Sequence, residues 1–507
     1  MTDYQPENKN DSATRADISG SSGHDRENSY RSILKGTSIF GGVQMFQIII
    51  NLIRGKFVAM LLGPAGMGVS SLFATSAQTI QQLSGLGLNL AIVKEVAAAN
   101  NDRQGLHHVI HTARRLVILT ALAGALACIL LSGTLSRITF GHDGYRWQFM
   151  LLSAMIFFGV AGQGYLSVLQ GLHEVKRISR ASIVGALTGL CAGVPIYYLF
   201  GTDGIVPAMV ILALATFLFY YINVKRLTSS QERRLITQSR RPLIKRLLML
   251  GLVLMASDLI GAGCNYLVNL FIRHYGALRD VGLFQAANSI TNQYSGVVFT
   301  AMMLDFFPRL SAAASDNARV KEIVNRQLEI VALIATPLVC LLILSSPLVI
   351  RILLTGEFMP ILPLMRWLGA GVLLKALMFP LGYITFAKDN RRLFFWLEGV
   401  AGNLLFLILS CLFYHTFGLI GLGYSLIADC SLCFIIYYVV NSRLYSYALS
   451  RQACRECLAA TGLGAACFAA SLLPHTALSW SVMSAITLLT IIRSLRTLRR
   501  LLRHKDA

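Results

Sequence analysis

The stretch VQMFQIIINLIRGKFVAM, residues 43–60, is apolar enough to enter a membrane, yet it carries an arginine and a lysine near its middle. A membrane-spanning helix needs about 20 mostly apolar residues, because each backbone polar group must be hydrogen-bonded inside the helix. A charge at that depth costs about 3 kcal/mol or more unless it faces water, a partner or a ligand. The stretch therefore predicts a membrane helix that borders a polar space.

The whole chain has the composition of a membrane protein. Of its 507 residues, 55% are hydrophobic and 14% are charged, and the mean hydropathy is +0.60, whereas soluble domains have about 25% charged residues. The formal net charge of +21 would indicate a nucleic-acid partner in a soluble chain. Here the basic residues are spread over loops and tails and do not gather in one domain, so we expect no nucleic-acid partner.

The hydrophobic segments predict an all-α polytopic membrane protein with about fourteen transmembrane helices, whose limits are accurate to a few residues. The expected spans are 38–62, 69–93, 115–135, 148–171, 181–200, 204–224, 247–272, 282–304, 328–350, 361–387, 393–414, 419–440, 457–473 and 477–492. The last two are the shortest, and we expect them to form an additional hairpin within residues 441–492.

Lysine and arginine gather in alternate loops, as they do in short cytoplasmic loops. With the N-terminus inside, the inner loops hold 25 of the 45 basic residues and the outer loops hold five. We therefore expect both termini in the cytoplasm and a basic cytoplasmic linker at residues 225–246. Residues 1–31 contain no apolar run and are predicted to be a disordered tail. Residues 493–507 form a basic tail suited to the anionic lipids of the inner leaflet.

Four helices carry polar residues at spacings of three, four or seven, which places each set on one helix face. The sets are Gln44, Gln47, Asn51 and Arg54; Thr75, Gln78, Gln82 and Asn89; Asp258, Asn265 and Asn269; and Gln285, Asn288, Asn292 and Ser295. Buried amides can simply link helices. Their restriction to helices 1, 2, 7 and 8 instead favours two six-helix lobes, residues 32–224 and 247–440, around a shared central cavity. The linkers LGPAGMG and YGALRDVG occupy matching places, so that Gly68 corresponds to Gly282.

Cations near the middle of the membrane are the strongest candidates for a binding role. Arg54 shares the polar face of the first helix, whereas Lys56 lies about 200° round the helix and nearer the surface. Lys375 is a further mid-membrane cation. The candidate substrate-binding residues are Arg54, Lys56, Lys375, Gln47, Asn51, Gln78, Gln82, Asn265, Asn288 and Asn292. The candidates for ion coupling or internal pairing are Asp258, Glu398 and Asp429. A cavity with buried cations suits an anionic cargo.

The cysteine pairs Cys430/Cys433 and Cys454/Cys457 have the spacing of a zinc ribbon. The first pair lies in the middle of a predicted span and the second near the inner surface, so the pairs are expected to be about 10 Å or more apart. We therefore expect neither a metal site nor another cofactor.

Three short runs resemble a known transporter family. RGKFVAMLLGPAGMGVSSLF (54–73), VGLFQ (281–285) and FFPRLS (306–311) are similar to the polysaccharide transporters that flip O-antigen and enterobacterial common antigen units. These transporters belong to the multidrug/oligosaccharidyl-lipid/polysaccharide superfamily, and the likeness extends over most of residues 32–440. Lys56 matches the Gly-Lys of this family, so the resemblance makes it a candidate binding residue beside Arg54. The additional C-terminal hairpin departs from the twelve-span members.

The resemblance implies two six-helix lobes that move an undecaprenyl-diphosphate-linked oligosaccharide by alternating access. The cargo would be an O-antigen or exopolysaccharide repeat unit, and the location the bacterial inner membrane. In such proteins cations in the cavity are thought to meet the diphosphate. A polysaccharide polymerase and a chain-length regulator are the protein partners to consider.

Two other functions remain open at this point. A cation-coupled multidrug antiporter of the same fold would favour a cavity rich in carboxylates, whereas the first two helices offer only Glu95, at an inner helix end. A membrane polymerase or ligase would need a large outer loop, but the longest outer connection, 136–147, has about a dozen residues. We expect a flippase that is not an enzyme.

Overall fold

The computed structural model describes residues 21–99, 103–228, 241–474 and 476–503. All regular secondary structure in these residues is helical, and each of the fourteen segments predicted as spans contains helix. The all-α class is confirmed.

The first half of the chain folds into seven α-helices. They are α1 (Ser21–Gly85), α2 (Leu88–Ala99), α3 (Arg103–Leu130), α4 (Ser132–Phe140), α5 (Arg146–Gly171), α6 (Val175–Phe200) and α7 (Ile205–Thr228). The second half contains α8 (Arg241–Tyr275), α9 (Leu278–Ala312), α10 (Asn317–Leu353), α11 (Leu362–Ala387), α12 (Arg391–Phe394), α13 (Asn403–Phe417), α14 (Gly421–Tyr445), α15 (Arg451–Ala470) and α16 (Thr476–Arg503). A π-helix, η4 (Phe395–Gly402), joins α12 to α13.

Two breaks shape the beginning of the chain. α1 bends at Gly63, which has φ 65° and ψ −172° and precedes Pro64, so the first helix ends at Leu62 as predicted. The second span, predicted as 69–93, is instead interrupted by Leu86 and Gly87, both of which have positive φ. A Cβ at Gly87 would lie 2.0 Å from the carbonyl oxygen of Gly251 on α8. This turn therefore lies directly against α8, a tertiary contact that no local pattern reveals.

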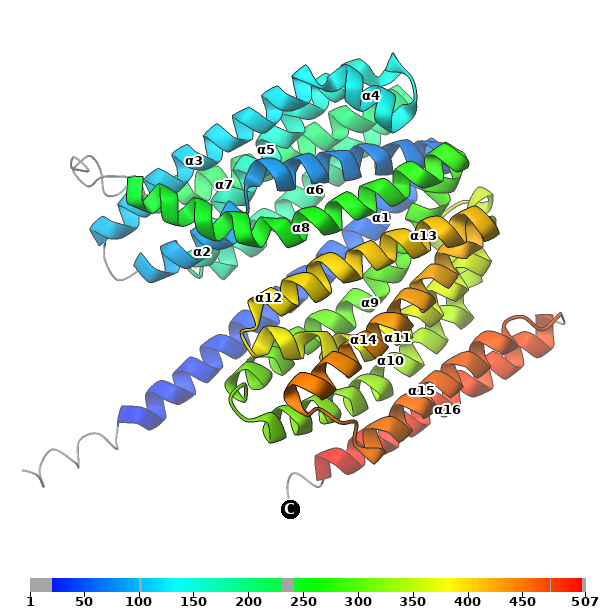
Figure 1. The fold of residues 1–507 in the computed structure, drawn as a ribbon. Helices are drawn as coiled ribbons and strands as arrows, with labels where there is room; N and C mark the ends of the chain where they lie inside the picture. Colours follow the sequence, from blue (N-terminus) through cyan, green and yellow to red (C-terminus); the bar gives the residue numbers. More distant parts are fainter. Residues whose placement is uncertain (1–20, 100–102, 229–240, 475, 504–507) are drawn as a thin grey trace, which may run out of the picture.

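The helices form two groups (Figure 1), as the two predicted lobes require. α2 to α7 gather around the second part of α1, and α9 to α14 form the other group. α1 packs against α6 and α9, and α8 packs against α1, α2 and α13, so both helices contact both groups.

Helices α15 and α16, the additional hairpin, pack against α10 and α11. Buried apolar residues of the four helices form one core, which includes Val339, Leu373, Cys467 and Met483. Arg366 of α11 also donates a hydrogen bond of 2.7 Å to the carbonyl oxygen of Ser471. The hairpin is therefore packed into the second group of helices.

Nine helical stretches of the described residues are long and apolar enough to cross a membrane. Three of them combine more than one helical segment. Phe46–Gly85 contains the two parts of α1, Val175–Leu227 contains α6 and most of α7, and Arg392–Tyr445 extends from α12 through η4 and α13 to the end of α14. α9 and α15 are not among the nine, and the exact number of fourteen spans stays a prediction.

Parts of the predicted tails and linker are helical. α1 begins at Ser21, inside the predicted tail 1–31, because a helix once formed extends at little cost. α7 and α8 extend to Thr228 and from Arg241, inside the predicted linker, and α16 continues to Arg503. Residues 1–20, 229–240 and 504–507 lie outside the described residues. The domain limits stay predictions.

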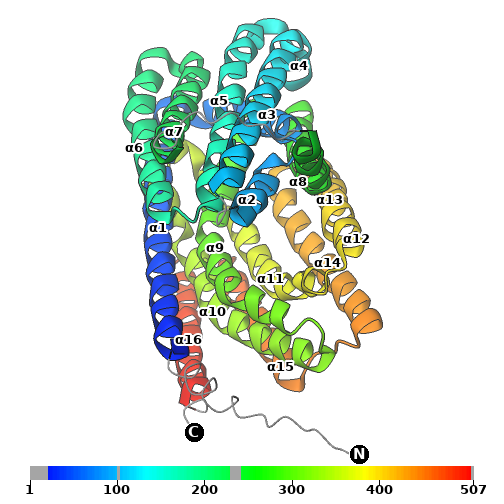
Figure 2. The ribbon, with the colours of Figure 1, turned by 90° about the vertical axis from the view of Figure 1, so that its left-hand side faces the viewer.

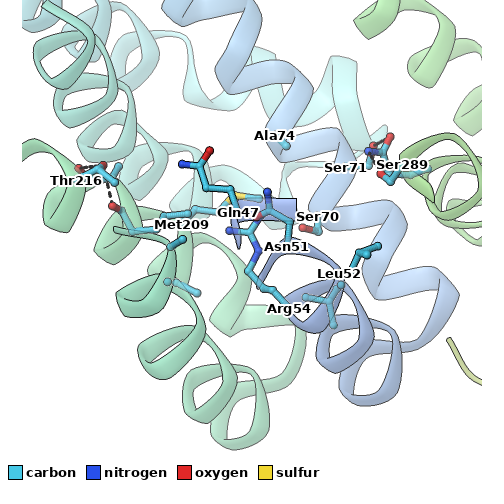
Figure 3. A pocket seen from close by; sticks show the side chains of 18 of the residues that line it. Gln47, Asn51, Leu52, Arg54, Ser70, Ser71, Ala74, Met209, Thr216 and Ser289 are labelled. Atoms are coloured by element: carbon cyan, nitrogen blue, oxygen red, sulfur yellow. Dashed lines mark hydrogen bonds between the residues drawn. The ribbon is translucent and has the colours of Figure 1, made fainter. Parts of the chain in front are cut away.

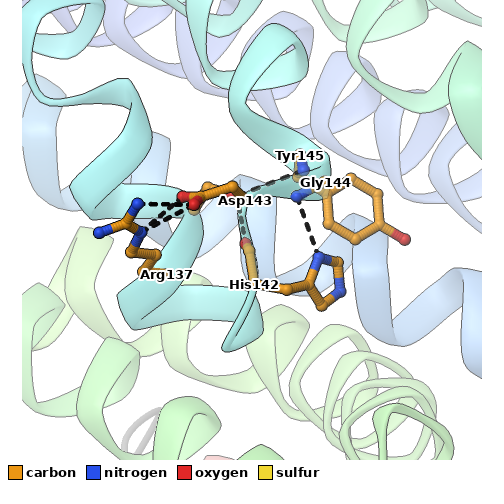
Figure 4. A network of polar contacts seen from close by, with 6 residues as sticks. Arg137, His142, Asp143, Gly144 and Tyr145 are labelled. Carbon is orange, nitrogen blue, oxygen red and sulfur yellow. Dashed lines mark hydrogen bonds and ion pairs between the residues drawn. The ribbon is translucent and has the colours of Figure 1, made fainter.

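A polar network closes the turn between α4 and α5 (Figure 4). Arg137 and Asp143 form an ion pair of 2.7 Å. The hydroxyl of Ser136 donates to the carbonyl oxygen of His142 and accepts from the backbone N–H of Tyr145. The hydrogen bond from Arg137 lowers the pKa of Asp143 below its usual value.

Candidate functional site

A cavity of about 700 Å³ lies between α1, α5, α6, α7 and α9. Gln47, Asn51, Arg54 and Lys56 line it from the first part of α1, and Figure 3 shows Gln47, Asn51 and Arg54 close together in this space. The volume falls within the range of about 300–1,000 Å³ that is usual for small-molecule sites. The polar face predicted for the first helix therefore borders a cavity.

Both cations near the middle of the first helix line the cavity, although Lys56 was expected on the other side of that helix. Both side chains are half-buried. The flexible stem of a lysine can carry its ammonium group around the helix surface toward a polar space. Tyr197, which is buried and also lines the cavity, lies near enough to Arg54 to interact with it electrostatically.

The wall opposite α1 comes from α5, α6 and α7, each of which supplies isolated polar groups. Gln163, Ser182, Thr216 and Tyr220 line the cavity among apolar and small residues. α6 and α7 pack closely at Gly189, where a Cβ would lie 2.6 Å from Cδ1 of Leu212. Small residues that let two helices approach are typical of membrane bundles. The closely packed helices α6 and α7 therefore form one continuous wall of the cavity.

The second half of the chain closes the cavity through α9. The hydroxyl of Ser71 donates a hydrogen bond of 3.1 Å to Gln285, and the amide of Gln285 donates one of 3.2 Å to Ser289. Ser71 belongs to α1 and the other two residues belong to α9. The cavity therefore lies where the two halves meet, and a relative movement of the halves would change its shape.

The cavity is electrostatically one-sided. Arg54 and Lys56 are its charged lining residues, and no aspartate or glutamate occurs among the described residues that line it. A guanidinium fork and an ammonium group are the side chains that best bind phosphate and carboxylate oxygens. Amides and hydroxyls such as those of Gln47, Gln163 and Thr216 can exchange hydrogen bonds with a neutral polar ligand. The arrangement suits a ligand with an anionic part and a hydroxyl-rich part.

Several predicted binding residues do not line this cavity. They are Gln78, Gln82, Asn265, Asn288, Asn292 and Lys375. Asn292 donates a hydrogen bond of 2.8 Å to Asn288, so these two amides are linked to each other on α9. Of the polar set predicted on this helix, Gln285 does line the cavity, and it is joined there by Ser289 and Gln293. The binding role of the six residues stays a prediction.

Lys375 lies in the second half, close to two of the candidate carboxylates. It interacts electrostatically with Glu398 of η4 and Asp429 of α14. The hydroxyl of Tyr437 hydrogen-bonds to Glu398. These residues do not line the cavity, and the internal pairing considered for the acidic residues stays a prediction. Asp258, the third candidate carboxylate, is an exposed residue of α8 and does not line the cavity either.

Some of the polar lining residues that the sequence analysis missed lie on helices without a predicted polar face. Gln163, Ser182, Thr216 and Tyr220 are of this kind, because each is one of few polar residues on its helix. A signal does exist on α7, where Ala208, Leu212, Thr216 and Tyr220 follow one another at spacings of four and all line the cavity. In the sequence, a helix face this apolar cannot be distinguished from one that packs in the protein core.

Within the described residues, no group of three or more His, Cys, Asp and Glu is arranged to hold a metal ion. In both cysteine pairs with zinc-ribbon spacing, each residue is a free thiol.

Comparisons with known proteins agree with this architecture. A family model described as polysaccharide biosynthesis protein matches residues 57–363. The lipid III flippase of Escherichia coli strain K12 is 24% identical over 416 residues, which cover 80% of this chain and 96% of that protein. A putative O-antigen transporter of Shigella flexneri is 24% identical over 308 residues, covering 58% of this chain and 70% of that protein. These relatives are a flippase and a transporter and not enzymes.

Solved structures show the same fold. The lipid II flippase MurJ in an inward closed conformation superimposes with a TM-score of 0.70 at 13% identity, covering 91% of this chain and 99% of that chain. A multidrug resistance transporter of the MATE family in an inward-facing conformation superimposes with a TM-score of 0.68 at 19% identity, covering 80% of this chain and 98% of that chain. The chain therefore belongs to the polysaccharide biosynthesis protein family and has the fold of the multidrug/oligosaccharidyl-lipid/polysaccharide transporter superfamily.

Proposed function

We propose that this protein is a flippase that moves an undecaprenyl-diphosphate-linked oligosaccharide, an O-antigen or exopolysaccharide repeat unit, across the bacterial inner membrane. The observation that carries the proposal is the cavity that Arg54 and Lys56 line without an acidic residue among its described lining. The related proteins named lipid III flippase and putative O-antigen transporter support the same class of cargo.

In this proposal the two cations bind the diphosphate while it crosses, and the amides and hydroxyls of the opposite wall contact the first sugars. The attraction between a cation and a phosphate strengthens where water is scarce. Release therefore needs water to re-enter, which a movement of one half against the other would allow at the Ser71–Gln285 contact. A polysaccharide polymerase and a chain-length regulator are the partners expected to act after release.

The same charge distribution disfavours a cation-coupled drug antiporter. A cationic drug would meet two like charges in the cavity, and the exposed carboxylate of Asp258 lies outside its lining. An anionic cargo gains from the arrangement that a cationic cargo would avoid.

The experiment replaces Arg54, Lys56 and Asp258 separately in a strain that depends on this protein for its surface polysaccharide. We expect Arg54→Ala to abolish surface polysaccharide while the protein stays in the membrane. Arg54→Lys should retain part of the activity if charge matters more than the guanidinium fork. Lys94→Ala, which removes an exposed lysine of α2 outside the cavity, is the matched control and should be neutral.

The result for Asp258→Asn decides between the two functions. If that change stops transport while Arg54→Ala and Lys56→Ala are both harmless, the cationic-cavity mechanism is wrong and a carboxylate-centred antiporter takes its place. Purified protein should also bind undecaprenyl diphosphate, and the Arg54→Ala protein should bind it more weakly.

A further inference from the structure

A second large hollow lies on the outside of the second helix group, between the end of α14 and the start of α15. It has a volume of about 740 Å³, and its lining includes Phe434, Ile435, Ser450, Arg451, Arg455 and Leu458. None of these residues lines the cavity that contains Arg54. We refer to this hollow as the α14/α15 groove.

The loop that joins α14 to α15 is fixed in place by hydrogen bonds to α10. Asn325 of α10 accepts a hydrogen bond of 2.9 Å from the backbone N–H of Ser450 and donates one of 3.1 Å to the carbonyl oxygen of Ala448. Tyr447, which is buried, directs its hydroxyl toward the same Asn325 at 3.4 Å. α15 packs chiefly on α10, α11 and α16 and barely touches α14. The space between the two helices is therefore built into the fold.

The walls of the groove are apolar and its rim is basic. Phe434, Ile435 and Leu458 offer hydrocarbon and aromatic surface, and the side chains of Ile435 and Leu458 are 56% and 67% exposed. Arg451 and Arg455 stand one turn apart on α15, so their side chains lie on the same face. No aspartate or glutamate lines the groove among the described residues.

The two arginines are available to an external ligand. Both residues are exposed. Arg455 approaches Glu456 at 3.6 Å, but Glu456 is bound more closely by Arg493, and the side chain of Arg455 remains 76% exposed. The N-terminus of α15 is already capped, because the hydroxyl of Ser450 accepts from the backbone N–H of Ala453. The guanidinium groups are therefore the donors that the groove offers.

The groove lies at the end of the molecule where α1 begins and α16 ends, which the distribution of basic residues assigns to the inner face of the membrane (Figure 1). At that level the surrounding medium changes from acyl chains to phosphate head groups. Basic pockets between helices on this side favour anionic head groups. Apolar walls beside two arginines thus match a molecule that has a hydrocarbon chain and an anionic phosphate.

We propose that the α14/α15 groove is a binding site for an anionic membrane phospholipid. One acyl chain lies against Phe434, Ile435 and Leu458, and the phosphate accepts hydrogen bonds from Arg451 and Arg455. The bound lipid fills the gap between the hairpin and α14, and so couples the hairpin to the rest of the second helix group. The site is separate from the transport cavity and does not depend on the cargo.

The test uses the full-length protein reconstituted in bilayers of phosphatidylcholine and phosphatidylglycerol, with the lipids that stay bound counted by native mass spectrometry. The wild type should retain phosphatidylglycerol in preference to phosphatidylcholine. Each arginine is expected to contribute about fivefold to this preference, so Arg451→Ala/Arg455→Ala should lose it. Ile435→Trp, which fills the groove and leaves its charges unchanged, should also lose the bound lipid.

The matched control is Arg496→Ala/Arg499→Ala, which removes two exposed arginines from α16 at the same end of the molecule and should retain the lipid. Size-exclusion chromatography checks that each variant is folded. The proposal is overturned if Arg451→Ala/Arg455→Ala retains as much phosphatidylglycerol as the control, if Ile435→Trp retains it, or if phosphatidylcholine is retained equally. Retention of a polyprenyl diphosphate in place of a phospholipid would also overturn it, because the occupant would then be the cargo.

Discussion

The backbones of Gly68 on α1 and Gly282 on α9 touch each other, and neither position has room for a side chain. A Cβ on Gly68 would lie 3.1 Å from the backbone nitrogen of Gly282 and 2.0 Å from the carbonyl oxygen of Leu278. A Cβ on Gly282 would lie 1.8 Å from the carbonyl oxygen of Pro64. These two glycines occupy matching places in the two halves of the sequence, and the fold brings them into contact near the cavity that contains Arg54.

Gly282→Ala should therefore destabilise the packing of α1 against α9. The atoms that the new methyl group would meet are backbone atoms, which cannot rotate away, and overpacking of this kind costs about 1–3 kcal/mol. We expect a lower thermal unfolding midpoint, measured on detergent-solubilised protein, together with reduced transport. Gly85→Ala on α1, the helix that contains Gly68, is the control, since no heavy atom lies within 4 Å of its Cβ position. Equal midpoints for the two variants would refute the importance of this contact.

The parts of the fold that depend on local chemistry could be predicted from the sequence. Hydrophobic length located the helices, and the Gly63–Pro64 pair ended the first one at Leu62. The break at Leu86 and Gly87 could not be predicted, because Gly87 packs against the carbonyl oxygen of Gly251, which is far away in the sequence. The π-helix η4 also lacked a sequence signal.

The candidate site was predictable on one wall only. The polar face with Gln47, Asn51 and Arg54 stands out because the rest of that helix is apolar, and it does line the cavity. On α9 the amides Asn288 and Asn292 were predicted to bind the substrate, but Asn292 donates a hydrogen bond to Asn288 and neither residue lines the cavity. Their neighbour Ser289 lines the cavity instead. The rotation of a helix by a fraction of a turn is set by packing against its neighbours, which the sequence does not display.

This difference leads to a prediction about two glutamines. Gln163 lines the cavity, whereas Gln78, the residue chosen from sequence spacing, does not. Gln163→Leu should reduce transport several-fold, because it removes a hydrogen-bonding group that faces the cargo, while Gln78→Leu should have little effect. The measurement is the amount of surface polysaccharide at equal protein levels. The opposite ranking would favour the sequence-derived face of the second helix over the cavity as the path of the cargo.

The Arg137–Asp143 pair predicts an acid sensitivity of the turn between α4 and α5. Hydrogen bonding from Arg137 lowers the pKa of Asp143 from its ordinary value of 3.8. A carboxyl group whose pKa is lower in the folded state contributes stability above its unfolded pKa, and that contribution is lost as the pH falls through the folded value. We expect Asp143→Asn to accelerate proteolysis of this turn at neutral pH. The difference from the wild type should shrink below about pH 4, and a difference that grows on acidification would contradict this explanation.

The ion pair between Glu456 and Arg493 should hold α15 and α16 together. The side chain of Glu456 is 7% exposed and that of Arg493 is 30% exposed. Removing one partner of a buried pair costs about 3–5 kcal/mol, and the partial exposure of Arg493 reduces this figure. Glu456→Ala should therefore lower the unfolding midpoint clearly.

The control for that change is Glu322→Ala. It breaks an ion pair of 2.6 Å between Glu322 and Arg326, whose side chains are 57% and 73% exposed, and pairs of this kind contribute about 0–1 kcal/mol. If the two variants lost the same stability, the buried pair would have no special part in attaching the hairpin.

The last prediction concerns the sidedness of the chain. α1 begins and α16 ends at the same end of the molecule (Figure 2), which requires an even number of membrane crossings between them. Basic residues are concentrated in the loops on that side, and we therefore expect both ends to be cytoplasmic. A phosphatase reporter fused after residue 507 should be inactive, and a fluorescent protein fused there should be bright. A reporter placed after Pro474, between α15 and α16, should give the opposite result, because that connection would face the periplasm. If both fusions were cytoplasmic, α15 and α16 would not cross the membrane, and the number of spans would be twelve.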